Sequence, residues 1–308
     1  MDRKVVLITG GAMGEGKSHA LKFAENGFDV VLADMQDPEG EVFKQTVAEI
    51  EATGAKALAV RKVTTNKGKK TPGVDGVLWS TPAAKMRGVL TLTDKGYKAK
   101  PLRRVFIEKK GKKTKRPLGI PCMYDRALQA LYALALDPVS ETTADTKSFG
   151  FRKGRCAQDA CEYIFTALSR SYSPEWVLEG DIKGCYDHIS HDWLIKHIPM
   201  DKSVLKQFLK AGFVFRDELF PTDAGTPQGG IISPILANLT LDGMQKVLSD
   251  HFDLSAKGEV SAFVHNKSRV NLVRYADDFI VTAATKEIAE EAKDILRDFL
   301  QARGLELS

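Results

Sequence analysis

Residues Asn271 to Thr282 read NLVRYADDFIVT, and two adjacent acids, Asp277 and Asp278, separate two stretches rich in β-branched and apolar side chains. Two such stretches joined by a short polar segment predict a β-hairpin with the acids at its tip. A two-residue hairpin turn usually favours Asn-Gly or Asp-Gly, whereas adjacent carboxylates repel each other unless a cation lies between them. The pattern predicts a metal-binding hairpin, although an exposed turn without a ligand fits this segment equally well.

A third acid closes a short apolar run farther up the chain. Residues Trp176 to Asp187 read WVLEGDIKGCYD, in which Asp181 follows a strand-like stretch. Phosphoryl transfer by the two-metal route needs carboxylates that hold two divalent cations about 3.5 to 4 Å apart. Asp181 together with the acidic pair could supply them, but this segment taken alone is also consistent with an exposed turn.

Other segments of the chain make the pattern more specific. Residues 275–278, Tyr-Ala-Asp-Asp, resemble the signature box of reverse transcriptases, and residues 176–187 are similar to the first palm motif of that family. Four further segments resemble blocks of its bacterial group II intron subfamily: TPGVDG at 71–76, RPLGIP at 116–121, SFGFR at 148–152 and GTPQGGIISP at 225–234. Six blocks in the family's order indicate that the chain from about residue 60 onwards resembles a group II intron-type reverse transcriptase.

The resemblance implies which residues form the metal site. Asp181, Asp277 and Asp278 match the catalytic carboxylates of the family, and the carbonyl of Ile182 matches an additional metal ligand. The implied metal is Mg²⁺, because hard oxygen ligands together with substrate phosphates suit this ion.

The resemblance also implies roles in substrate binding. Lys109 and Arg116 match residues that hold the triphosphate, for which a cationic point charge and a bidentate fork are suited. Tyr186 matches the aromatic residue under the incoming sugar that excludes a 2′ hydroxyl, with a core tyrosine as the alternative. Gln228 matches the residue that supports the template and the nascent base pair.

The charge distribution indicates a polyanionic partner. The formal net charge is +5, but residues 61–116 contain 18 Lys or Arg against 3 Asp or Glu. Such a block is either a solvated tail or a polyanion-binding face, and the apolar residues and turn signals within it favour an ordered face. Nucleic acid is the expected partner. The resemblance makes this an RNA template, with intron RNA as the native partner, a DNA primer and dNTPs.

The first 60 residues have a different pattern. Strand-like runs at 4–9 and 28–33 alternate with helix-like segments at 17–26 and 39–53, which predicts a β-α-β-α unit. Gly10, Gly14 and Gly16 on the first turn, with Asp34 after the second strand, resemble the dinucleotide-binding motif of short-chain dehydrogenases. No tyrosine of the chain is followed four residues later by lysine, so the proton-transfer pair of that family is missing. We expect no bound dinucleotide cofactor and no dehydrogenase activity.

The expected fold class is α/β, an α+β right-hand polymerase preceded by a partial Rossmann-like unit. The expected domains are a dinucleotide-binding-type unit at 1–60, fingers at 61–175 and a palm at 176–308 that ends before the thumb, with the change of sequence near residues 57–62.

The four cysteines form no C-x-x-C pair, which indicates free thiols and the cytoplasm. No apolar run reaches the roughly 18 residues of a membrane helix.

The predicted function is RNA-directed DNA polymerase activity, with template-directed extension of a DNA 3′ end. Two alternatives stay open at this point. One is a catalytically inactive RNA-binding fragment, and the other is an NAD-dependent oxidoreductase, which the missing proton-transfer pair disfavours.

Overall fold

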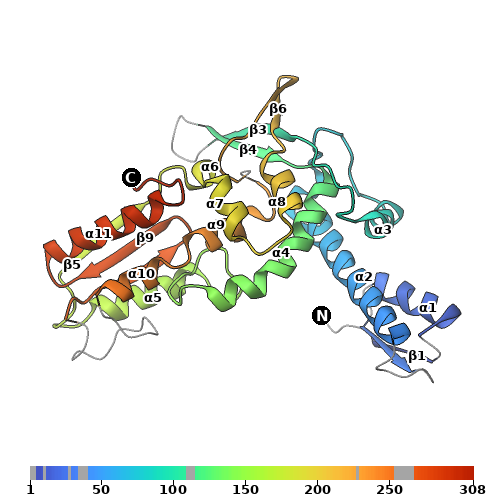
Figure 1. Cartoon of the computed structure of the whole chain (residues 1–308), viewed down its shortest axis with the longest axis horizontal. Helices are drawn as coiled ribbons and strands as arrows, with labels where there is room; N and C mark the ends of the chain where they lie inside the picture. The colour runs from blue at the N-terminus through green and yellow to red at the C-terminus, as the bar shows by residue number, and fades with distance from the viewer. Residues whose placement is uncertain are drawn as a thin grey trace. The chain divides into compact units, whose positions relative to one another are not determined.

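The computed structural model describes residues 5–9, 12–26, 29–33, 41–108, 115–226, 229–252 and 267–308. The chain forms two compact units, the first made of Met1–Ala135 with Ala211–Phe220 and the second of Leu136–Lys210 with Pro221–Ser308 (Figure 1). No helix in the described ranges is long and apolar enough to cross a membrane. The four cysteines are free thiols, as expected, with Cys122 and Cys185 buried and the other two exposed.

The first unit begins with the predicted β-α-β-α arrangement. Its elements are β1 (Val5–Thr9), α1 (Gly14–Glu25), β2 (Asp29–Ala33) and α2 (Glu41–Thr65). The strands pair in parallel, with Val5 opposite Asp29 and Thr9 opposite Ala33, and an ion pair of 2.9 Å joins Lys17 of α1 to Glu49 of α2. The fold expected for this segment is therefore confirmed; Gly10 and Asp34 lie outside the described residues.

Helix α2 is longer than the sequence pattern indicated. The expected end was near residue 53, yet the helix continues to Thr65 and passes through Gly54. A glycine inside a helix costs only about 1 kcal/mol relative to alanine. Burial of Ala59, Val60 and Val63 offsets that cost. The change of sequence near residues 57–62 therefore falls inside one continuous helix, and its position stays a prediction.

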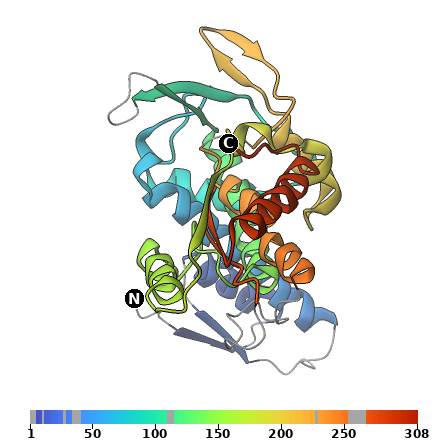
Figure 2. The same cartoon turned by 90° about the vertical axis from the view of Figure 1, so that its left-hand side faces the viewer.

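The rest of the first unit contains a four-stranded sheet. Its further elements are the 3-10 helix η1 (Lys67–Lys70), α3 (Pro82–Thr91), β3 (Leu102–Glu108), β4 (Lys115–Ile120), the start of α4 (Met123–Thr143), β6 (Phe213–Phe215) and β7 (Glu218–Phe220). The strand order is β4-β3-β6-β7, and two residues of β3 pair in parallel with β6 although more than 100 residues separate them (Figure 2). Arg126 of α4 donates to the carbonyls of Thr71 (2.6 Å) and Gly68 (3.1 Å), which fixes the segment leading into the 71–76 block.

The second unit is built on the three-stranded sheet β5-β9-β8. Its elements are α5 (Ala157–Leu168), β5 (Trp176–Asp181), α6 (Cys185–His188), α7 (His191–His197), α8 (Lys202–Leu209), α9 (Ser233–Leu241), α10 (Met244–His251), β8 (Asn271–Tyr275), β9 (Asp278–Ala283) and α11 (Lys286–Gln301). Both pairings are antiparallel.

Helices pack on both faces of this sheet. On one face α11 lies along β5 and β9 and buries Ala292, Leu296 and Leu300 (Figure 1). On the other face Ala160 of α5 packs with Phe149 and Val273. The α+β architecture expected for the second part of the chain is thus observed, and the sheet supplies a rigid base for the hairpin that joins β8 to β9.

Candidate active site

The acidic pair lies at the tip of the predicted hairpin. Strand β8 ends at Tyr275 and β9 begins at Asp278, which pair with each other, so the turn consists of Ala276 and Asp277. Ala276 has a φ of 60°, in the left-handed region that alanine seldom adopts. The hairpin predicted from the sequence is confirmed, with Asp277 half-buried and Asp278 exposed.

The third acid is brought to the same tip by strand pairing. Asp181 is the last residue of β5 and lies directly opposite Asp278 of β9. Directly opposed residues of an antiparallel pair point to the same face, with Cβ atoms about 4.5 to 5.5 Å apart. Gly180 is required beside it, because a Cβ there would lie 2.4 Å from the ring of Phe279.

The negative charges at this tip act on one another and on a nearby thiol. Burial, followed by the charges of Asp277, Asp181 and Glu179, raises the pKa of Asp278. Burial, followed by the negative charges of Asp277, Asp181 and Asp187, raises the pKa of the Cys185 thiol to about 12. Mutual repulsion of this kind is what a bound cation relieves.

The site fits a hard divalent cation that shares its ligands with substrate. Within the described ranges, no group of three or more Asp, Glu, His or Cys side chains is arranged to hold a metal ion by itself. Mg²⁺ in nucleotide-processing sites is commonly held by one or two carboxylates, with waters and substrate phosphates completing the octahedron. The facing pair Asp181 and Asp278, with Asp277 beside them, is a donor set of this type.

The end of the described chain supports the strand that carries Asp181. Ile182 forms an antiparallel bridge with Leu307, through hydrogen bonds from Lys183 N to Glu306 O (3.0 Å) and from Ser308 N to Asp181 O (2.9 Å). These two bonds use the carbonyls of Asp181 and Glu306, so the bridge does not use the Ile182 carbonyl. Its role as a metal ligand stays a prediction.

Tyr186 lies beside Gly225 and Thr226, the first two residues of the 225–234 block. Its backbone carbonyl accepts a hydrogen bond from Thr226 N at 2.7 Å, and a Cβ on Gly225 would lie 2.4 Å from the same oxygen. The Gly225 carbonyl also contacts Nε2 of the buried His191 at 2.8 Å. Helix α6 and residues 225–226 are therefore fixed to each other, whereas Gln228 lies outside the described residues.

The residues predicted to hold the triphosphate belong to the first unit. Arg116 is exposed on β4 and pairs with Ile107 of β3. Lys109 lies outside the described residues. The three acids belong to the second unit, and the contribution of Arg116 to substrate binding stays a prediction.

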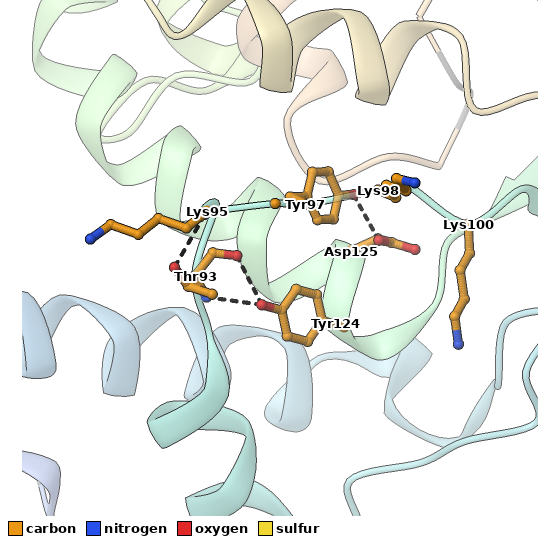
Figure 3. A pocket seen from close by; sticks show the side chains of 8 residues that line it. Thr93, Lys95, Tyr97, Lys98, Lys100, Tyr124 and Asp125 are labelled. Carbon is orange, nitrogen blue, oxygen red and sulfur yellow. Dashed lines mark hydrogen bonds between the residues drawn. The ribbon is translucent and has the colours of Figure 1, made fainter.

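A cavity in the first unit contains none of the predicted site residues. It has a volume of about 320 Å³ and is lined by Thr93, Lys95, Gly96, Tyr97, Lys98, Lys100, Tyr124 and Asp125 (Figure 3). The Tyr97 hydroxyl donates to Asp125 Oδ1 at 2.7 Å, and the Tyr124 hydroxyl accepts from Thr93 N at 2.9 Å. These bonds fix the loop between α3 and β3 on α4, which is a structural role.

Sequence reasoning missed a buried ionic cluster beneath the hairpin. Asp242 lies between Arg274 of β8 and Arg152, with N–O distances of 2.7 and 2.6 Å. Two signals were available: Arg274 is a charged residue directly after the apolar pair Leu272 and Val273, and Arg152 belongs to the 148–152 block. Neither signal identifies Asp242 as the common partner.

The chain matches two family models. Residues 107–308 match the family "Reverse transcriptase (RNA-dependent DNA polymerase)", and residues 42–92 match the "N-terminal domain of reverse transcriptase". The first match spans more than half of the chain. The second begins within helix α2.

Individual relatives agree with the family models. The chain is 36% identical over 199 residues to the group II intron-encoded protein LtrA of Lactococcus lactis, covering 61% of this chain and 32% of LtrA. It is 31% identical over 282 residues to protein YkfC of Escherichia coli, covering 80% of this chain and 74% of YkfC. A separate match of 44% identity over 75 residues, 24% of this chain and 29% of the relative, is to cyclopentanol dehydrogenase of Comamonas.

The match to LtrA covers about a third of that protein's length. The RNA-directed DNA polymerases form a family that generally uses divalent metal ions and binds RNA templates. On the family model and the relatives together, the chain belongs to the reverse transcriptase (RNA-dependent DNA polymerase) family and is of the group II intron type.

Proposed function

We propose that the chain carries the catalytic centre of an RNA-directed DNA polymerase, in which Asp181, Asp277 and Asp278 act as the catalytic carboxylates. The observation that carries this proposal is the strand register that sets Asp181 opposite Asp278, with Asp277 in the adjoining turn. Three acids from two distant segments would be costly neighbours in a site without a cation.

The proposed metal is Mg²⁺, held by the side chains of Asp181, Asp277 and Asp278 and by the carbonyl of Ile182. When bound, divalent cations supply Lewis-acid activation of a primer 3′ hydroxyl and neutralise charge on the triphosphate. The chain itself contributes carboxylates fixed in advance on a packed sheet, which reduces reorganisation during the reaction.

The proposed substrates are dNTPs, a DNA primer and an RNA template, with intron RNA as the native partner. The name of LtrA supports the last point for a relative of this chain. Lys109 and Arg116 would bind the triphosphate, Tyr186 would exclude a 2′ hydroxyl, and Gln228 would support the nascent base pair. The basic segment 61–116 supports a polyanionic template.

We further propose that residues 1–58 are a short-chain dehydrogenase-like fragment without oxidoreductase activity. The parallel β1-α1-β2 arrangement and the dehydrogenase match support the resemblance. The missing Tyr-x-x-x-Lys pair argues against the activity. The limits 1–60, 61–175 and 176–308 for this unit, the fingers and the palm are part of the same proposal.

Primer extension on an RNA template with Mg²⁺ tests the polymerase. Asp277→Asn keeps the side-chain shape and removes the charge, so extension should fall by about a thousandfold or more, equivalent to about 4 kcal/mol. Asp192→Asn, an exposed position in the first turn of α7, is the matched control and should retain the rate.

Two results would count against the proposal. Retention of more than about a tenth of the rate by Asp277→Asn would show that the catalytic assignment is wrong. Salt-sensitive RNA binding without any extension would favour the inactive RNA-binding fragment.

A further inference from the structure

A single buried arginine contacts the turn that carries Asp277. The side chain of Arg274 is fully buried, one residue before the end of β8. Its Nη1 donates to the carbonyl of Ala276 and to Asn238 Oδ1, both at 3.1 Å, and its Nη2 donates to Asp242 Oδ1 at 2.7 Å. The guanidinium therefore joins the turn to the end of α9.

Asp242 also pairs with a second arginine, Arg152. Arg152 donates from Nη2 to both oxygens of Asp242, at 2.6 and 2.8 Å, and from Nη1 to Glu141 at 2.8 Å. The hydrogen bonds of Arg152 go to Asp242, Glu141 and residues 140 and 148, whereas those of Arg274 reach the hairpin turn. The two arginines thus share one carboxylate, but only Arg274 is bonded to the Ala276 carbonyl.

The 148–152 block holds the hairpin on another side. Ser148 bridges Arg274 in parallel, and hydrogen bonds of 2.9 Å run from Phe149 N to Arg274 O and from Arg274 N to Lys147 O. A Cβ on Gly150 would lie 2.3 Å from Ala276 N, which leaves no space for a side chain. The Asn238 amide donates to Gly150 O at 3.0 Å, so the side chain that accepts from Arg274 also fixes this loop.

The turn held in this way is a strained one. Ala276 is at a φ of 60°, a conformation that persists in a non-glycine residue only when surrounding contacts enforce it. Arg274 provides such a contact at the Ala276 carbonyl, and Gly150 leaves the space that the Ala276 amide occupies. Asp277 is the next residue, so relaxation of Ala276 would move its carboxylate away from Asp181 and Asp278.

We propose that Arg274, held by Asp242, is a positioning residue for the catalytic carboxylate Asp277, and that Gly150 gives the turn the space it needs. This inference rests on the proposed polymerase function. A displacement of about 1 Å can cost about a hundredfold in rate, so removal of this hydrogen bond should lower the rate more than it lowers substrate affinity.

The experiment compares Arg274→Lys with Arg152→Lys in the full chain. Each variant keeps a positive charge beside Asp242 but replaces the planar guanidinium by an ammonium group. Only Arg274→Lys removes the hydrogen bond to the Ala276 carbonyl. We expect Arg274→Lys to lower kcat for primer extension by about ten- to a hundredfold, with KM for dNTP changed less than about twofold. Arg152→Lys should keep kcat within about threefold at the same temperature below both Tm values.

Metal binding gives a readout that needs no extension activity. Calorimetric titration with Mn²⁺ as the probe should show weaker binding in Arg274→Lys and in Asp277→Asn, and unchanged binding in Arg152→Lys. Hydrogen exchange of peptides covering residues 271–283 should rise in Arg274→Lys alone. Equal Mn²⁺ affinity and equal exchange in the two lysine variants would overturn the inference, whether or not the chain extends primers.

A further variant separates displacement of the turn from a general loss of folding caused by changing a buried arginine. Gly150→Ala leaves both arginines in place and pushes on the Ala276 amide, so it should give the same fall in kcat and Mn²⁺ affinity as Arg274→Lys. Normal values in a folded Gly150→Ala protein would contradict the proposal. If Asp277→Asn is impaired while Arg274→Lys is normal, only this inference fails; if Asp277→Asn is normal, the proposed function itself fails.

Discussion

The two-stranded sheet β1-β2 and the three-stranded sheet β5-β9-β8 differ in the candidate site residues that they position. In the described part of the first unit, β1 pairs with β2 alone, and α1 begins at Gly14 of the glycine-rich sequence that comes after β1. In the second unit, β9 lies between β5 and β8, helices pack on both faces, and strand register gathers three acids at one end. Parallel strands normally belong to larger sheets that are buried on both faces, and two paired strands alone are only marginally stable.

The difference is the reason that we expect a site at the hairpin and none at the glycine-rich segment after β1. At the tip of the β8–β9 hairpin, every acid is placed by cross-strand pairing or by the turn itself, and a buried arginine holds that turn. For the glycine-rich segment after β1, the sequence supplies no Tyr-x-x-x-Lys pair to transfer a proton. Substitutions in the two regions should therefore have very different effects.

The largest difference should appear in primer extension. Asp181→Asn removes one of the facing carboxylates, so the rate should fall by about a thousandfold. Gly16→Ala, in the glycine-rich segment at the start of α1, should leave the rate within about twofold, because alanine is the better helix former. A comparable fall in rate for both variants would break the contrast.

The next difference concerns stability. Arg274→Met removes three hydrogen bonds of a fully buried guanidinium, to Asp242, Asn238 and the Ala276 carbonyl, which should cost about 3 to 5 kcal/mol in urea unfolding. Lys17→Met removes the ion pair with the solvent-exposed Glu49 in the N-terminal segment and should lower the urea midpoint much less, because water screens such a pair. Similar decreases in stability for both would show that the cluster under the hairpin is not specially important.

RNA binding should depend on the basic segment. Changing Lys109, Lys112, Lys113 and Arg116 to Gln should weaken binding and make affinity less dependent on salt. For a single-stranded RNA, the log–log slope should become shallower by about 0.7 for each phosphate that the variant no longer neutralises. Lys293→Gln, exposed on α11, is the control and should change neither quantity. An affinity equal at low and physiological salt in the unmodified chain would contradict the prediction.

A smaller effect should appear when pH is varied. Burial lowers the pKa of His191, whose Nε2 lies 2.8 Å from the Gly225 carbonyl. The unfolded chain therefore takes up a proton first, so the stability associated with the neutral ring is present above the unfolded-state pKa of about 6.5 and decreases as pH falls below it. Thermal unfolding between pH 7.5 and 5 should show a flatter profile for His191→Gln than for the unmodified chain. His19→Gln, at an exposed position of α1, should leave the profile unchanged.

The smallest effect should be that of adding a dinucleotide to the chain. Titration of the full chain with NAD⁺ should give no heat of binding above the background and no shift in Tm. The reason is that β1 and β2 pair only with each other in the part of the chain that the structure describes, whereas a dinucleotide site is completed by neighbouring strands. Tight binding would restore the oxidoreductase alternative and remove the contrast between the two sheets.

Local pattern was sufficient for several features. The hairpin at 271–282, the strand ending at Asp181 and the β-α-β-α order at the start were all predictable, because alternation of apolar residues and turn chemistry act over a few residues. The length of α2 was not, because burial of Ala59 and Val63 decides whether a helix continues past Gly54.

The sequence by itself determined which residues are acidic and which segments form strands. Only the tertiary structure decided that Asp181 lies opposite Asp278, since that register depends on how β5 packs against β9 across nearly 100 residues. It also decided that Arg152 and Arg274 share Asp242, because a buried charge selects its partner by proximity in space and no spacing in the sequence encodes that proximity.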